Sequence, residues 1–513
     1  MGTNRLVDKT YKSDIPECDI PALDLLTLLF ESPYCTAKED TILHAEAHDP
    51  SIFVTKSEAR KLTKRLAYVL RTQFGIGANG PGKDVVLTMS TGQHFLPVLF
   101  YGVVAAGGVY SAASPTFTAS ELSRQIKDGP ANLIVCSREV KEVAEEAAQS
   151  CGLSLDRVLV LESYPVRKLE STTGEWKCTL GPELDWERIS DPDELSKSLV
   201  CLLYSSGTTG LPKGYFVNPF YDAGTVFWMP KFSFPEFLKY CKEHRITTFF
   251  TVPPICLAIA KHPMVTDQLD SIRIAYTGAA PISAELQRAV GSKMGRGSVF
   301  ISQTWGMTEA CGGCTHMPPY ETDGYLGSVS PLMQNMLLRI VDDDDNDVPD
   351  GEPGEALLKG PLITTGYHNN PSANAESFTD GWLRSGDVAQ VRNGIVFIVD
   401  RKKELIKYNG LQIAPAELEA LLISHPLIVD AAVIGVQTRD GNEVPRAYVV
   451  ADKTKLSASD ILDFIEVQVS SHKKLRGGVY FIAAIPRTPS GKISRKDLRE
   501  RAKRELSSPG PNF

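Results

Sequence analysis

Residues 205–214, SSGTTGLPKG, have the residue types and spacing to bind an anion. Glycines let backbone N–H groups approach an oxyanion, hydroxyls donate hydrogen bonds, and Lys213 supplies a positive charge. The order differs from a Walker A loop, because Pro212 rather than glycine precedes Lys213. By composition alone, a phosphate-binding loop and a solvated surface loop are equally good interpretations.

The elements that must position this loop follow an α/β pattern up to about residue 400. Short apolar runs, separated by helical patterns, occur at DVVLTMS (84–90), NLIVCS (132–137), RVLVLES (157–163), LVCLLYS (199–205) and ITTFFTV (246–252). Strands spaced in this way predict parallel sheets with helices on their faces. Thr118 and Glu121 have the spacing of a capping box that opens a helix.

After Asp400 the pattern changes to a small α+β unit. Pro415 can begin a helix, DAAVIGV and RAYVVA are typical of strands, and Ser457 and Asp460 have capping-box spacing. The charged segment DRKKELIKYNG (400–410) lies between the two patterns. We therefore place the domain boundary there.

Length and composition set further bounds. The 513 residues exceed the usual domain of ~100–150 residues severalfold, so two or three modules are expected. The net charge of -8 gives no reason to expect nucleic acid or anionic membrane as a partner. The apolar window from Phe95 is interrupted by Pro97 and two glycines, which favours a buried helix and strand over a membrane span.

Targeting signals and cysteines favour a reducing compartment. The N-terminus has no apolar signal region, and the ten cysteines are scattered, several of them inside apolar runs. The C-terminal SSPGPNF is not an S-K-L peroxisomal tail. We expect a cytoplasmic protein with reduced cysteines, and the peroxisome remains open.

Six motifs, in this order, resemble the adenylate-forming (AMP-binding) superfamily of acyl-CoA synthetases, 4-coumarate–CoA ligases and luciferases. They are SSGTTGLPKG, YTGAAP (276–281), QTWGMTE (303–309), SGD (385–387), DRKKELIKYNG (400–410) and RTPSGKISR (487–495). The resemblance covers nearly the whole chain. It implies an α/β large domain over 1–400, with parallel sheets covered by helices plus a small β subdomain. A small, mobile α+β C-terminal domain over 401–513 would follow.

The resemblance implies an ATP-dependent carboxylic acid–CoA ligase. The acid and ATP would give an acyl-adenylate and pyrophosphate, and the thiol of coenzyme A would then displace AMP. The implied partners are a small carboxylic acid, ATP, Mg²⁺ and CoA, with no nucleic acid, and the implied assembly is a monomer or weak oligomer. The implied ATP/AMP-binding residues are Ser205, Ser206, Gly207, Thr208, Thr209, Lys213, Gly278, Ala279, Ala280, Gln303, Thr304, Trp305, Gly306, Thr308, Asp387, Arg401 and Lys492.

Four of the matched residues are implied to be catalytic: Lys492, Lys407, Thr308 and Glu309. Lys492, in TPSGK, would bridge the substrate carboxylate and the α-phosphate, where charge develops in the transition state. Glu309 would bind Mg²⁺ together with ATP. Lys407 matches a lysine that meets the adenylate, and Thr308 matches a phosphate-contacting hydroxyl.

Other matched residues are implied to bind or to move. Asp387 and Arg401 would contact the ribose. Trp305 stands where the family usually has tyrosine, and its aromatic face is expected to stack on adenine. Lys403 matches the hinge about which the small domain rotates between the half-reactions. Lys231, Asn409 and Gly410 match CoA contacts; because Asn409 replaces a family lysine, CoA affinity is less securely implied than ATP affinity.

The acyl pocket is expected beside Glu309, at Ala310, Cys311, Gly312 and Gly313. The matching positions in coumarate ligases carry bulkier groups, and small side chains enlarge a pocket. We therefore expect larger aromatic or medium-chain acids to be preferred over acetate.

Family members continue after LPKG with a segment that this chain lacks. Here Gly214 and Gly224 are separated by only nine residues, so a few dozen residues of the large domain are absent. The chain is either a divergent natural form or the product of a mis-spliced or mis-predicted gene. The alternative to an active ligase is a catalytically impaired or non-catalytic nucleotide-binding protein.

Two further patterns have simpler interpretations. Cys311 and Cys314 have zinc or redox spacing, but no second ligand pair accompanies them, which favours core or pocket lining. The acidic run 342–347, DDDDND, is interpreted as a solvated hairpin turn rather than a calcium loop, because the spacing to a terminal glutamate is wrong.

Overall fold

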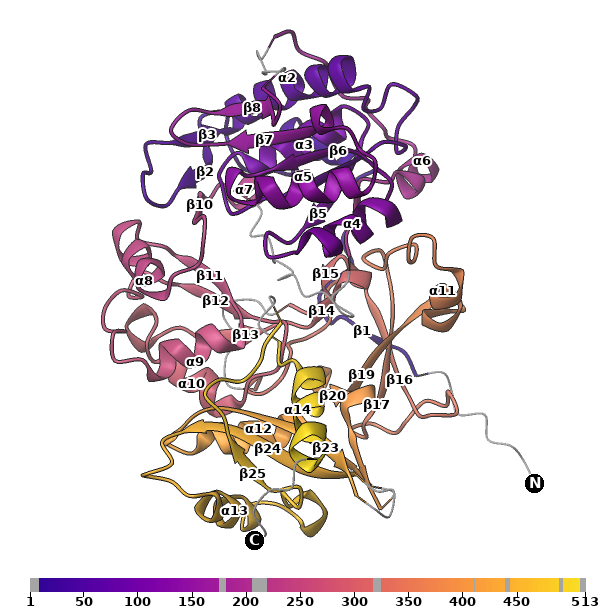
Figure 1. Cartoon of the computed structure of the whole chain (residues 1–513). Helices are drawn as coiled ribbons and strands as arrows, with labels where there is room; N and C mark the ends of the chain where they lie inside the picture. The colour runs from indigo at the N-terminus through magenta and orange to yellow at the C-terminus, as the bar shows by residue number, and fades with distance from the viewer. Residues whose placement is uncertain are drawn as a thin grey trace, which may run out of the picture. The chain divides into compact units, whose positions relative to one another are not determined.

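The computed structural model describes residues 9–174, 181–204, 219–316, 324–409, 411–438, 443–488 and 492–507. These residues fall into two compact units. The first unit comprises 19–204 and 219–240, and the second comprises 9–18 and the described residues from 241 onward. Figure 1 labels their helices and strands.

The first unit is built on a six-stranded sheet of order β8-β7-β6-β4-β5-β9. All neighbouring strands are parallel except the antiparallel pair β7 and β8. The predicted strands are confirmed, although the run 199–205 contributes only a two-residue strand. The strands are β4 (Val85–Met89), β5 (Val109–Ala113), β6 (Ala131–Cys136), β7 (Val158–Glu162), β8 (Lys168–Ser171) and β9 (Cys201–Leu202).

Helices cover both faces of this sheet (Figure 1). Successive strand residues point to opposite faces: Leu133 and Val135 of β6 join one hydrophobic cluster, and Ile134 and Cys136 join another. The first cluster includes residues of two long helices, besides residues of the short α1 (Leu25–Phe30) and α7 (Pro219–Asp222), and the second includes residues of two other helices. These four helices are α2 (Lys56–Phe74) and α3 (Leu96–Ala105), then α4 (Ala119–Asp128) and α5 (Lys141–Ser150).

Local sequence signals begin these helices as expected. The predicted capping box is present at α4, where Thr118 Oγ1 accepts from Glu121 N and Glu121 Oε2 accepts from Thr118 N. The apolar window from Phe95 forms α3 and β5. None of the helices described in the structure has the length and apolarity that crossing a membrane requires.

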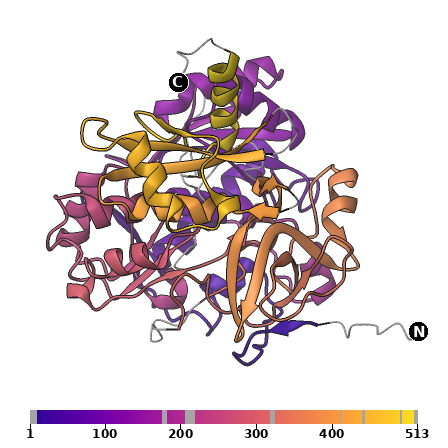
Figure 2. The same ribbon diagram turned by 90° about the horizontal axis from the view of Figure 1, so that it is seen from below.

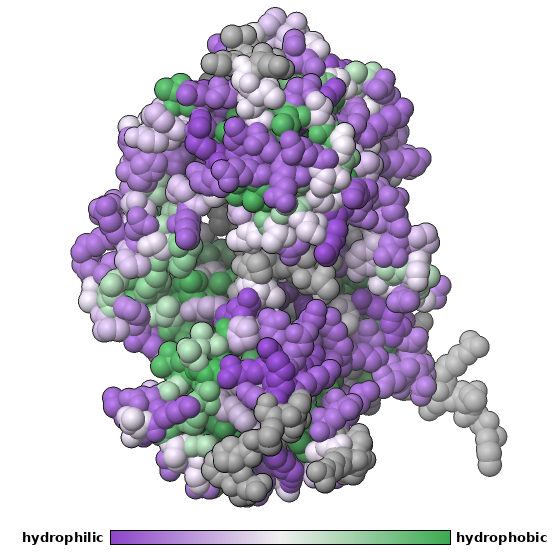
Figure 3. All heavy atoms as spheres, viewed as in Figure 1, coloured by the Kyte–Doolittle hydropathy of each residue, from purple (hydrophilic) through white to green (hydrophobic). Residues whose placement is uncertain are grey.

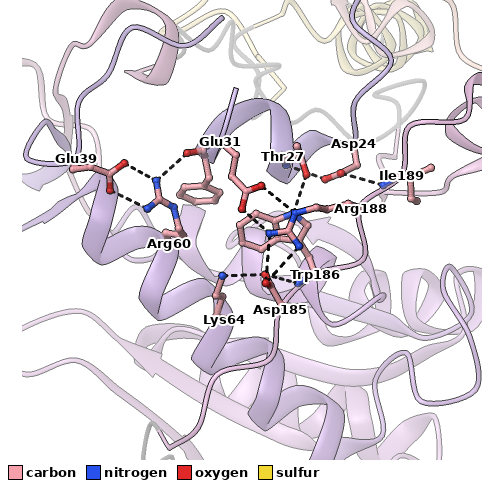
Figure 4. Close-up of polar contacts among 11 residues, drawn as sticks. Asp24, Thr27, Glu31, Glu39, Arg60, Lys64, Asp185, Trp186, Arg188 and Ile189 are labelled. Atoms are coloured by element: carbon pink, nitrogen blue, oxygen red, sulfur yellow. Dashed lines mark hydrogen bonds and ion pairs between the residues drawn. The ribbon is translucent and has the colours of Figure 1, made fainter. Parts of the chain in front are cut away.

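The first unit also contains a small sheet of order β10-β2-β3. A polar network connects the first helix of this unit, α1, to the loop that contains Trp186 and Arg188 (Figure 4). Trp186 Nε1 donates to Thr27 Oγ1 at 3.0 Å, and Arg188 forms two hydrogen bonds with Glu31. Asp24 both caps that helix and accepts from Ile189 N. The remaining elements of the unit are α1 (Leu25–Phe30), β2 (Ile42–Glu46), β3 (Phe53–Thr55), α6 (Pro192–Lys197), α7 (Pro219–Asp222) and β10 (Val226–Trp228). Helix α8 (Phe234–Glu243) contains the boundary between the two units, after residue 240.

The second unit begins with a three-stranded parallel sheet, β11 (Thr248–Thr251), β12 (Ile274–Thr277) and β13 (Ile301–Gln303). Helices α9 (Pro253–Lys261) and α10 (Ala284–Gly291) connect these strands. A short antiparallel pair follows, β14 (Gly306–Met307) and β15 (Gly312–Gly313). The βαβαβ order matches the predicted α/β class.

An antiparallel sheet of order β1-β16-β17-β19-β18, with β20 on β19, forms the β subdomain that the resemblance implies. It curves in both ribbon views (Figures 1 and 2). Its elements are β1 (Tyr11–Lys12), β16 (Leu337–Val341), β17 (Gly354–Lys359), α11 (Pro371–Ser377), β18 (Phe378–Thr379), β19 (Trp382–Arg392) and β20 (Ile395–Arg401).

The C-terminal α+β region has the predicted elements. Pro415 is the first residue of its first helix, and Ser457 and Asp460 form the predicted capping box. The strands pair as β21 with β22, and as β23-β24-β25. The elements are β21 (Ile406–Tyr408), β22 (Leu411–Ile413), α12 (Pro415–Ser424), β23 (Ile428–Gln437), β24 (Glu443–Ala451), α13 (Ala458–Glu466), β25 (Val479–Phe481) and α14 (Arg495–Ser507).

Candidate active site

The candidate site lies where β12 and β13 end. The two strands are parallel neighbours, and Thr277 pairs with Gln303 at their carboxyl ends. Open α/β sheets bind their ligands at this edge. The strands therefore bring together two sequence-predicted segments, residues 278–280 and 304–306.

The two segments approach closely because Gly278 lacks a side chain. A Cβ there would lie 3.1 Å from Thr304 Oγ1 and 3.3 Å from Phe250 Cζ. Ala279, the next residue, has a left-handed φ of 74°. Gln303 fixes the loop: its Oε1 accepts from Ile282 N at 2.7 Å, and its Nε2 donates to Ile282 O at 3.0 Å.

A buried carboxylate lies beside the predicted adenine-binding tryptophan. Trp305 Nε1 donates to Asp387 Oδ2 at 2.8 Å. Asp387 pairs directly with Arg401 across the antiparallel strands β19 and β20, and Arg401 Nε lies 3.6 Å from Asp387 Oδ1. The structure thus brings together three predicted nucleotide-binding residues. Their direct link, the indole N–H, was not foreseen, because the sequence prediction assigned Trp305 only a stacking face.

The neighbours of Asp387 do not fully offset the cost of burying its negative charge. Burial raises the pKa of its carboxyl, and the Arg401 guanidinium, the Trp305 hydrogen bond and the Lys492 ammonium each oppose that rise. Lys492 therefore lies close enough for its charge to act on Asp387. Lys492 N donates to Thr488 Oγ1, and Thr488 N donates to Lys492 O at 2.8 Å, which fixes the backbone of Lys492.

Thr308 and Glu309 lie in the turn between β14 and β15, which form a tight antiparallel pair. A Cβ on Gly306 would lie 1.8 Å from Gly312 O, so this pairing requires glycine at position 306. The Thr308 hydroxyl is buried and has no hydrogen-bond partner among the described residues. A buried hydroxyl without a partner costs free energy, so a ligand that accepts from it would bind favourably.

Tyr367 is a site residue that the sequence analysis missed. Its hydroxyl donates to Glu309 Oε1 at 3.1 Å. Asn374 holds the Tyr367 backbone, accepting from Tyr367 N at 2.6 Å and donating to Tyr367 O at 3.0 Å. No local pattern could have identified Tyr367, because its contact with Glu309 spans 58 positions in the sequence.

The four residues predicted to line an acyl pocket have different environments. Ala310 is fully buried in a hydrophobic cluster with Met307 and Cys314. Cys311 is exposed and has a left-handed φ of 51°. Gly312 has a φ of 127°, and a Cβ placed on it would have no atom within 4 Å, whereas Gly313 is partly buried. Their assignment to the acyl pocket stays a prediction.

Several other predicted residues are exposed or lie outside the described residues. Lys403 and Lys407 are exposed, and the charge of Lys407 acts on Asp343. Asn409 is exposed with a φ of 49°, and Lys231 is an exposed residue of the first unit. The segment 205–214, with Ser205, Ser206, Gly207, Thr208, Thr209 and Lys213, lies outside the described residues, as does Gly410.

The acidic run 342–347 is a turn whose residues 342–346 are exposed, as predicted, but its ion pairs were not foreseen. Asp343 pairs with Lys402 at 2.8 Å, and Asp345 pairs with Arg384 at 2.7 Å. Asp347 is buried and pairs with Arg339 at 2.9 Å. The β subdomain supplies these cations from neighbouring strands, which the sequence of the run alone could not reveal.

The residues present fit a magnesium nucleotide. An undercompensated carboxylate, a buried hydroxyl without a partner and a glutamate oriented by Tyr367 supply groups for ribose, phosphate and a hard cation. One protein carboxylate suits Mg²⁺, which keeps several waters and is bound largely through substrate phosphates. Among the described residues, no group of three His, Cys, Asp or Glu side chains could hold a metal ion without such help.

Comparisons with known proteins agree with this arrangement. A family model described as AMP-binding enzyme matches residues 36–218 and 215–368. A second, described as AMP-binding enzyme C-terminal domain, matches 417–492.

Curated relatives match over almost their whole lengths. A protein of Emericella nidulans that carries the name acyl-coenzyme A synthetase is 44% identical over 546 residues, covering 95% of this chain and 98% of the relative. Phenylacetyl-CoA ligase epaB of Aspergillus niger is 32% identical, covering 95% and 98%. The 4-coumarate:CoA ligase 1 of Petunia hybrida is 33% identical, covering 96% and 97%.

Solved structures share the fold. The ATP-bound MatB of Rhodopseudomonas palustris superposes with a TM-score of 0.79 at 24% identity, covering 94% of this chain and 99% of that one. Acyl-CoA synthetases and CoA ligases recur among the relatives, so the chain is an enzyme of the AMP-forming acid–thiol ligase class. It belongs to the AMP-binding enzyme family, the adenylate-forming superfamily of acyl-CoA synthetases and 4-coumarate–CoA ligases.

Proposed function

We propose that this chain is an ATP- and Mg²⁺-dependent carboxylic acid–CoA ligase that activates an aryl or medium-chain acid as its acyl-adenylate. The observation that carries the proposal is the cluster of Trp305, Arg401 and Lys492 around the buried Asp387. These residues come from three segments far apart in the sequence. A nucleotide whose ribose donates to Asp387 would supply the compensation that the protein leaves incomplete.

In the first half-reaction, a carboxylate oxygen of the substrate attacks the α-phosphorus of ATP. The new O–P bond forms as the bond to the bridging oxygen breaks, and pyrophosphate leaves. The Lys492 ammonium would lie between the carboxylate and the α-phosphate, where negative charge builds up in the transition state. Asp387 and Arg401 would hold the ribose, which fixes the position of the α-phosphorus.

The phosphate and metal contacts fall to Thr308 and Glu309. The Thr308 hydroxyl would donate to a phosphate oxygen, which gives this buried group the partner that it lacks among the described residues. Glu309, oriented by Tyr367, would hold Mg²⁺, which supplies neutralisation of the triphosphate charge when bound. Residues 205–213 are proposed to cradle the same phosphates.

In the second half-reaction, the thiol of coenzyme A attacks the carbonyl carbon of the adenylate. The C–O bond to the phosphate breaks, AMP leaves and the thiol proton is released. We assign Lys403 as the hinge of the C-terminal region and Lys407 as the lysine that meets the adenylate after rotation. Lys231, Asn409 and Gly410 are the proposed CoA contacts.

The acid is proposed to be larger than acetate. Two of the relatives are a phenylacetyl-CoA ligase and a 4-coumarate–CoA ligase. The small residues Ala310, Cys311, Gly312 and Gly313 after Glu309 favour the same class of substrate. Each methylene in an apolar pocket changes kcat/KM by roughly 10-fold or more, so phenylacetate, 4-coumarate or octanoate should exceed acetate at least ~10-fold.

A second candidate is a catalytically impaired, nucleotide-binding protein. The two matches of the large-domain family model meet at residues 215–218, where the sequence analysis places a missing segment. The alignment with the Emericella nidulans protein also runs over 546 positions, more than the 513 residues of this chain. Both observations favour a loss within the large domain.

A pyrophosphate-release assay separates the two candidates. The full chain is incubated with ATP, Mg²⁺ and each of the four acids, beside a version in which the segment after Gly214 is restored from the Emericella nidulans relative. Acid-dependent release by the full chain supports the ligase. Release by the restored version alone supports the impaired protein, and release by neither contradicts the proposed ligase activity.

A further inference from the structure

Helix α12 is held at both ends by charged side chains that precede the proposed hinge. At its first turn, Asp400 Oδ2 accepts from Ala416 N at 3.0 Å. At its last turn, Lys261 Nζ donates to Ile423 O at 3.2 Å, and it also donates to Ile428 O, at the start of β23, at 2.5 Å. Lys261 is the last residue of α9, and Asp400 lies at the end of β20.

Both contacts satisfy groups that the helix itself leaves without partners. The first N–H groups and last C=O groups of an α-helix have no intrahelical partners. The N-cap residue, Ala414, makes no side-chain cap, so Asp400 supplies the acceptor that is missing there. A carboxylate at the N-terminus and an ammonium at the C-terminus also match the helix dipole. The arrangement is therefore a charge clamp, defined as Asp400 and Lys261 acting on α12.

The clamp is specific for one orientation of the C-terminal region. Lys261 and Asp400 precede Lys403 in the sequence, whereas α12 and β23 follow it. Rotation about Lys403 would carry Ile423 and Ile428 away from Lys261. In the orientation with the clamp closed, the Lys492 ammonium acts on Asp387.

A continuous set of contacts links the clamp to Lys492. Ile428 begins β23, and Asp430, two residues later, accepts two hydrogen bonds from Arg487 Nη2 at 2.8 and 2.9 Å. Arg487 pairs with Ile493 in an antiparallel bridge, immediately beside Lys492. The Asp430 charge also acts on Lys261. The contact of Lys261 with Ile428 is thus connected, through Asp430 and Arg487, to Ile493, the residue that follows Lys492.

The surface beside the clamp is apolar and would not by itself fix an orientation. Met264, three residues after Lys261, and Leu427 and Val429, on either side of Ile428, are exposed. Figure 3 shows green, apolar surface over the part of the second unit that carries α9 and α12. Apolar contact is non-directional, whereas the hydrogen bonds of Lys261 require two particular carbonyl groups.

We propose that Lys261 is a positioning residue for adenylation, which with Asp400 holds α12 in the orientation that brings Lys492 to the nucleotide site. The proposal rests on the proposed function for the reaction that it serves, but the clamp itself is a statement about orientation. Loss of Lys261 should slow acyl-adenylate formation, which needs Lys492. It should spare the thiol step, which uses the rotated orientation.

The kinetic test compares Lys261→Met with the parent. Methionine keeps an apolar stem but removes the ammonium donors. ATP–pyrophosphate exchange with phenylacetate should fall at least ~10-fold, which corresponds to ~1.4 kcal/mol. CoA-thioester formation from supplied phenylacetyl-adenylate should stay within twofold of the parent. Exchange within twofold of the parent, or an equal loss in both steps, would overturn the proposal.

Two variants control for general damage. Lys293→Met changes an exposed lysine of the same unit and should leave both steps unchanged. Lys261→Arg keeps the charge and donors and should restore exchange to within about threefold of the parent. If Lys261→Arg were as slow as Lys261→Met while both variants unfolded at the parent's temperature, the clamp would not be the cause.

An orientation measurement decides the case even if the parent forms no adenylate. Spin labels on non-canonical residues at Arg288 of α10 and Ser459 of α13, both exposed, report the distance across the clamp by pulsed electron resonance. The parent with AMP should give one narrow distribution, and Lys261→Met should give a broader or displaced one. Identical distributions would refute the clamp, whereas failure of exchange in the parent would count only against the proposed function.

Discussion

Two carboxylates with low exposure, Glu46 in the first unit and Asp387 in the second, are surrounded differently. The Glu46 side chain is 3% exposed, and Glu46 Oε1 accepts from His94 Nδ1 at 2.6 Å and from His94 N at 3.1 Å. Arg167 Nε contacts the far nitrogen, His94 Nε2, at 3.4 Å. The Asp387 side chain is 13% exposed and has one hydrogen bond from Trp305, with Arg401 at 3.6 Å.

The difference distinguishes a stabilising network around Glu46 from the candidate binding site around Asp387. Glu46, His94 and Arg167 belong to one compact unit, in which Glu46 accepts from His94 and Arg167 also pairs with Glu58 and Phe53 O. Asp387 draws on residues from both sides of the proposed hinge, its pKa is raised, and the nearby Thr308 motif contains a hydroxyl without a partner among the described residues. Completed networks stabilise the fold, whereas incomplete ones are available to a ligand. Substitutions in the two networks should therefore have opposite effects on stability and binding.

The largest expected effect is on stability. Glu46→Ala removes the acceptor of two hydrogen bonds from the buried His94, and each buried donor left without a partner costs ~1–3 kcal/mol. We expect urea unfolding of the first unit to shift by that amount, while the ATP affinity of the folded protein is unchanged. Glu187→Ala, at an exposed position, is the control and should change stability by less than ~0.5 kcal/mol. A loss of ATP affinity in Glu46→Ala would break the contrast.

The next largest effect is expected on the rate of acyl-adenylate formation and not on the stability of the fold. Lys492→Ala should slow acyl-adenylate formation at least ~100-fold, because it removes the charge that is proposed to stabilise the transition state, while ATP binding persists. Pyrophosphate release and calorimetric ATP binding measure the two quantities. Lys496→Ala, an exposed lysine four residues later, should behave as the parent. Adenylate formation by Lys492→Ala at the parent's rate would refute the assigned role.

Acid should destabilise the first unit through His44. Trp228 Nε1 contacts His44 Nδ1, and the buried Nε2 has no partner among the described residues. Burial, with His94 contributing, lowers the pKa of His44 to about 3. The unfolded chain therefore binds a proton between pH ~6.5 and 3 that the folded chain excludes, so stability is full above 6.5 and falls as the pH is lowered.

The expected loss is ~1.4 kcal/mol per pH unit between about pH 6 and 4. Urea unfolding at several pH values measures it. His44→Asn should reduce the slope, although its starting stability is lower, whereas His472→Asn, in the C-terminal region, should not. Equal slopes in the parent and His44→Asn would remove His44 as the cause.

Asp387→Asn should reverse the pattern of Glu46→Ala. It removes a carboxylate whose ionised form is disfavoured by burial, so the unfolding temperature at pH 7 should rise. ATP affinity should fall ~10-fold, because an amide oxygen accepts more weakly from the ribose hydroxyls than a carboxylate does. Thermal unfolding and calorimetry give the two readings. A fall in both would place Asp387 with the stabilising networks instead.

The smallest effect tests the Thr308 hydroxyl. Thr308→Val keeps the shape and removes a buried donor that has no partner among the described residues, so the unfolding temperature without ligand should not fall. ATP affinity should drop roughly 2- to 10-fold, the value of one hydrogen bond. The matched control is Thr315→Val: Thr315 Oγ1 accepts from Trp305 N at 2.8 Å, so stability should fall there. Equal stability losses in both variants would contradict the assignment.

Much of the fold could be predicted because its signals are local. The apolar runs that became β4, β6 and β7, and the capping boxes at Thr118 and Ser457, depend on neighbouring residues. For the run 199–205, the sequence predicted too long a strand, because apolar composition alone does not determine strand length. Its observed strand ends at Leu202.

The order of the motifs in the sequence identified the candidate site residues. It did not predict the contacts among residues that are far apart in the chain. The pairing of Asp387 with Arg401 across β19 and β20, the Trp305 N–H bond and the Tyr367 contact with Glu309 join residues far apart in the chain. The ion pairs of the acidic run have the same origin, since Lys402 and Arg384 come from other elements. No local periodicity encodes such contacts.

The central claim, that this chain activates a carboxylic acid as an acyl-adenylate, is tested most directly by following oxygen. The full chain is incubated with ATP, Mg²⁺, CoA and phenylacetate labelled with ¹⁸O in both carboxylate oxygens. One labelled oxygen should appear in the phosphate of AMP, because the carboxylate oxygen that bonds to the α-phosphorus leaves with AMP when the thiol attacks the carbonyl. Thioester formation with unlabelled AMP, or with ADP as the product, would contradict the account.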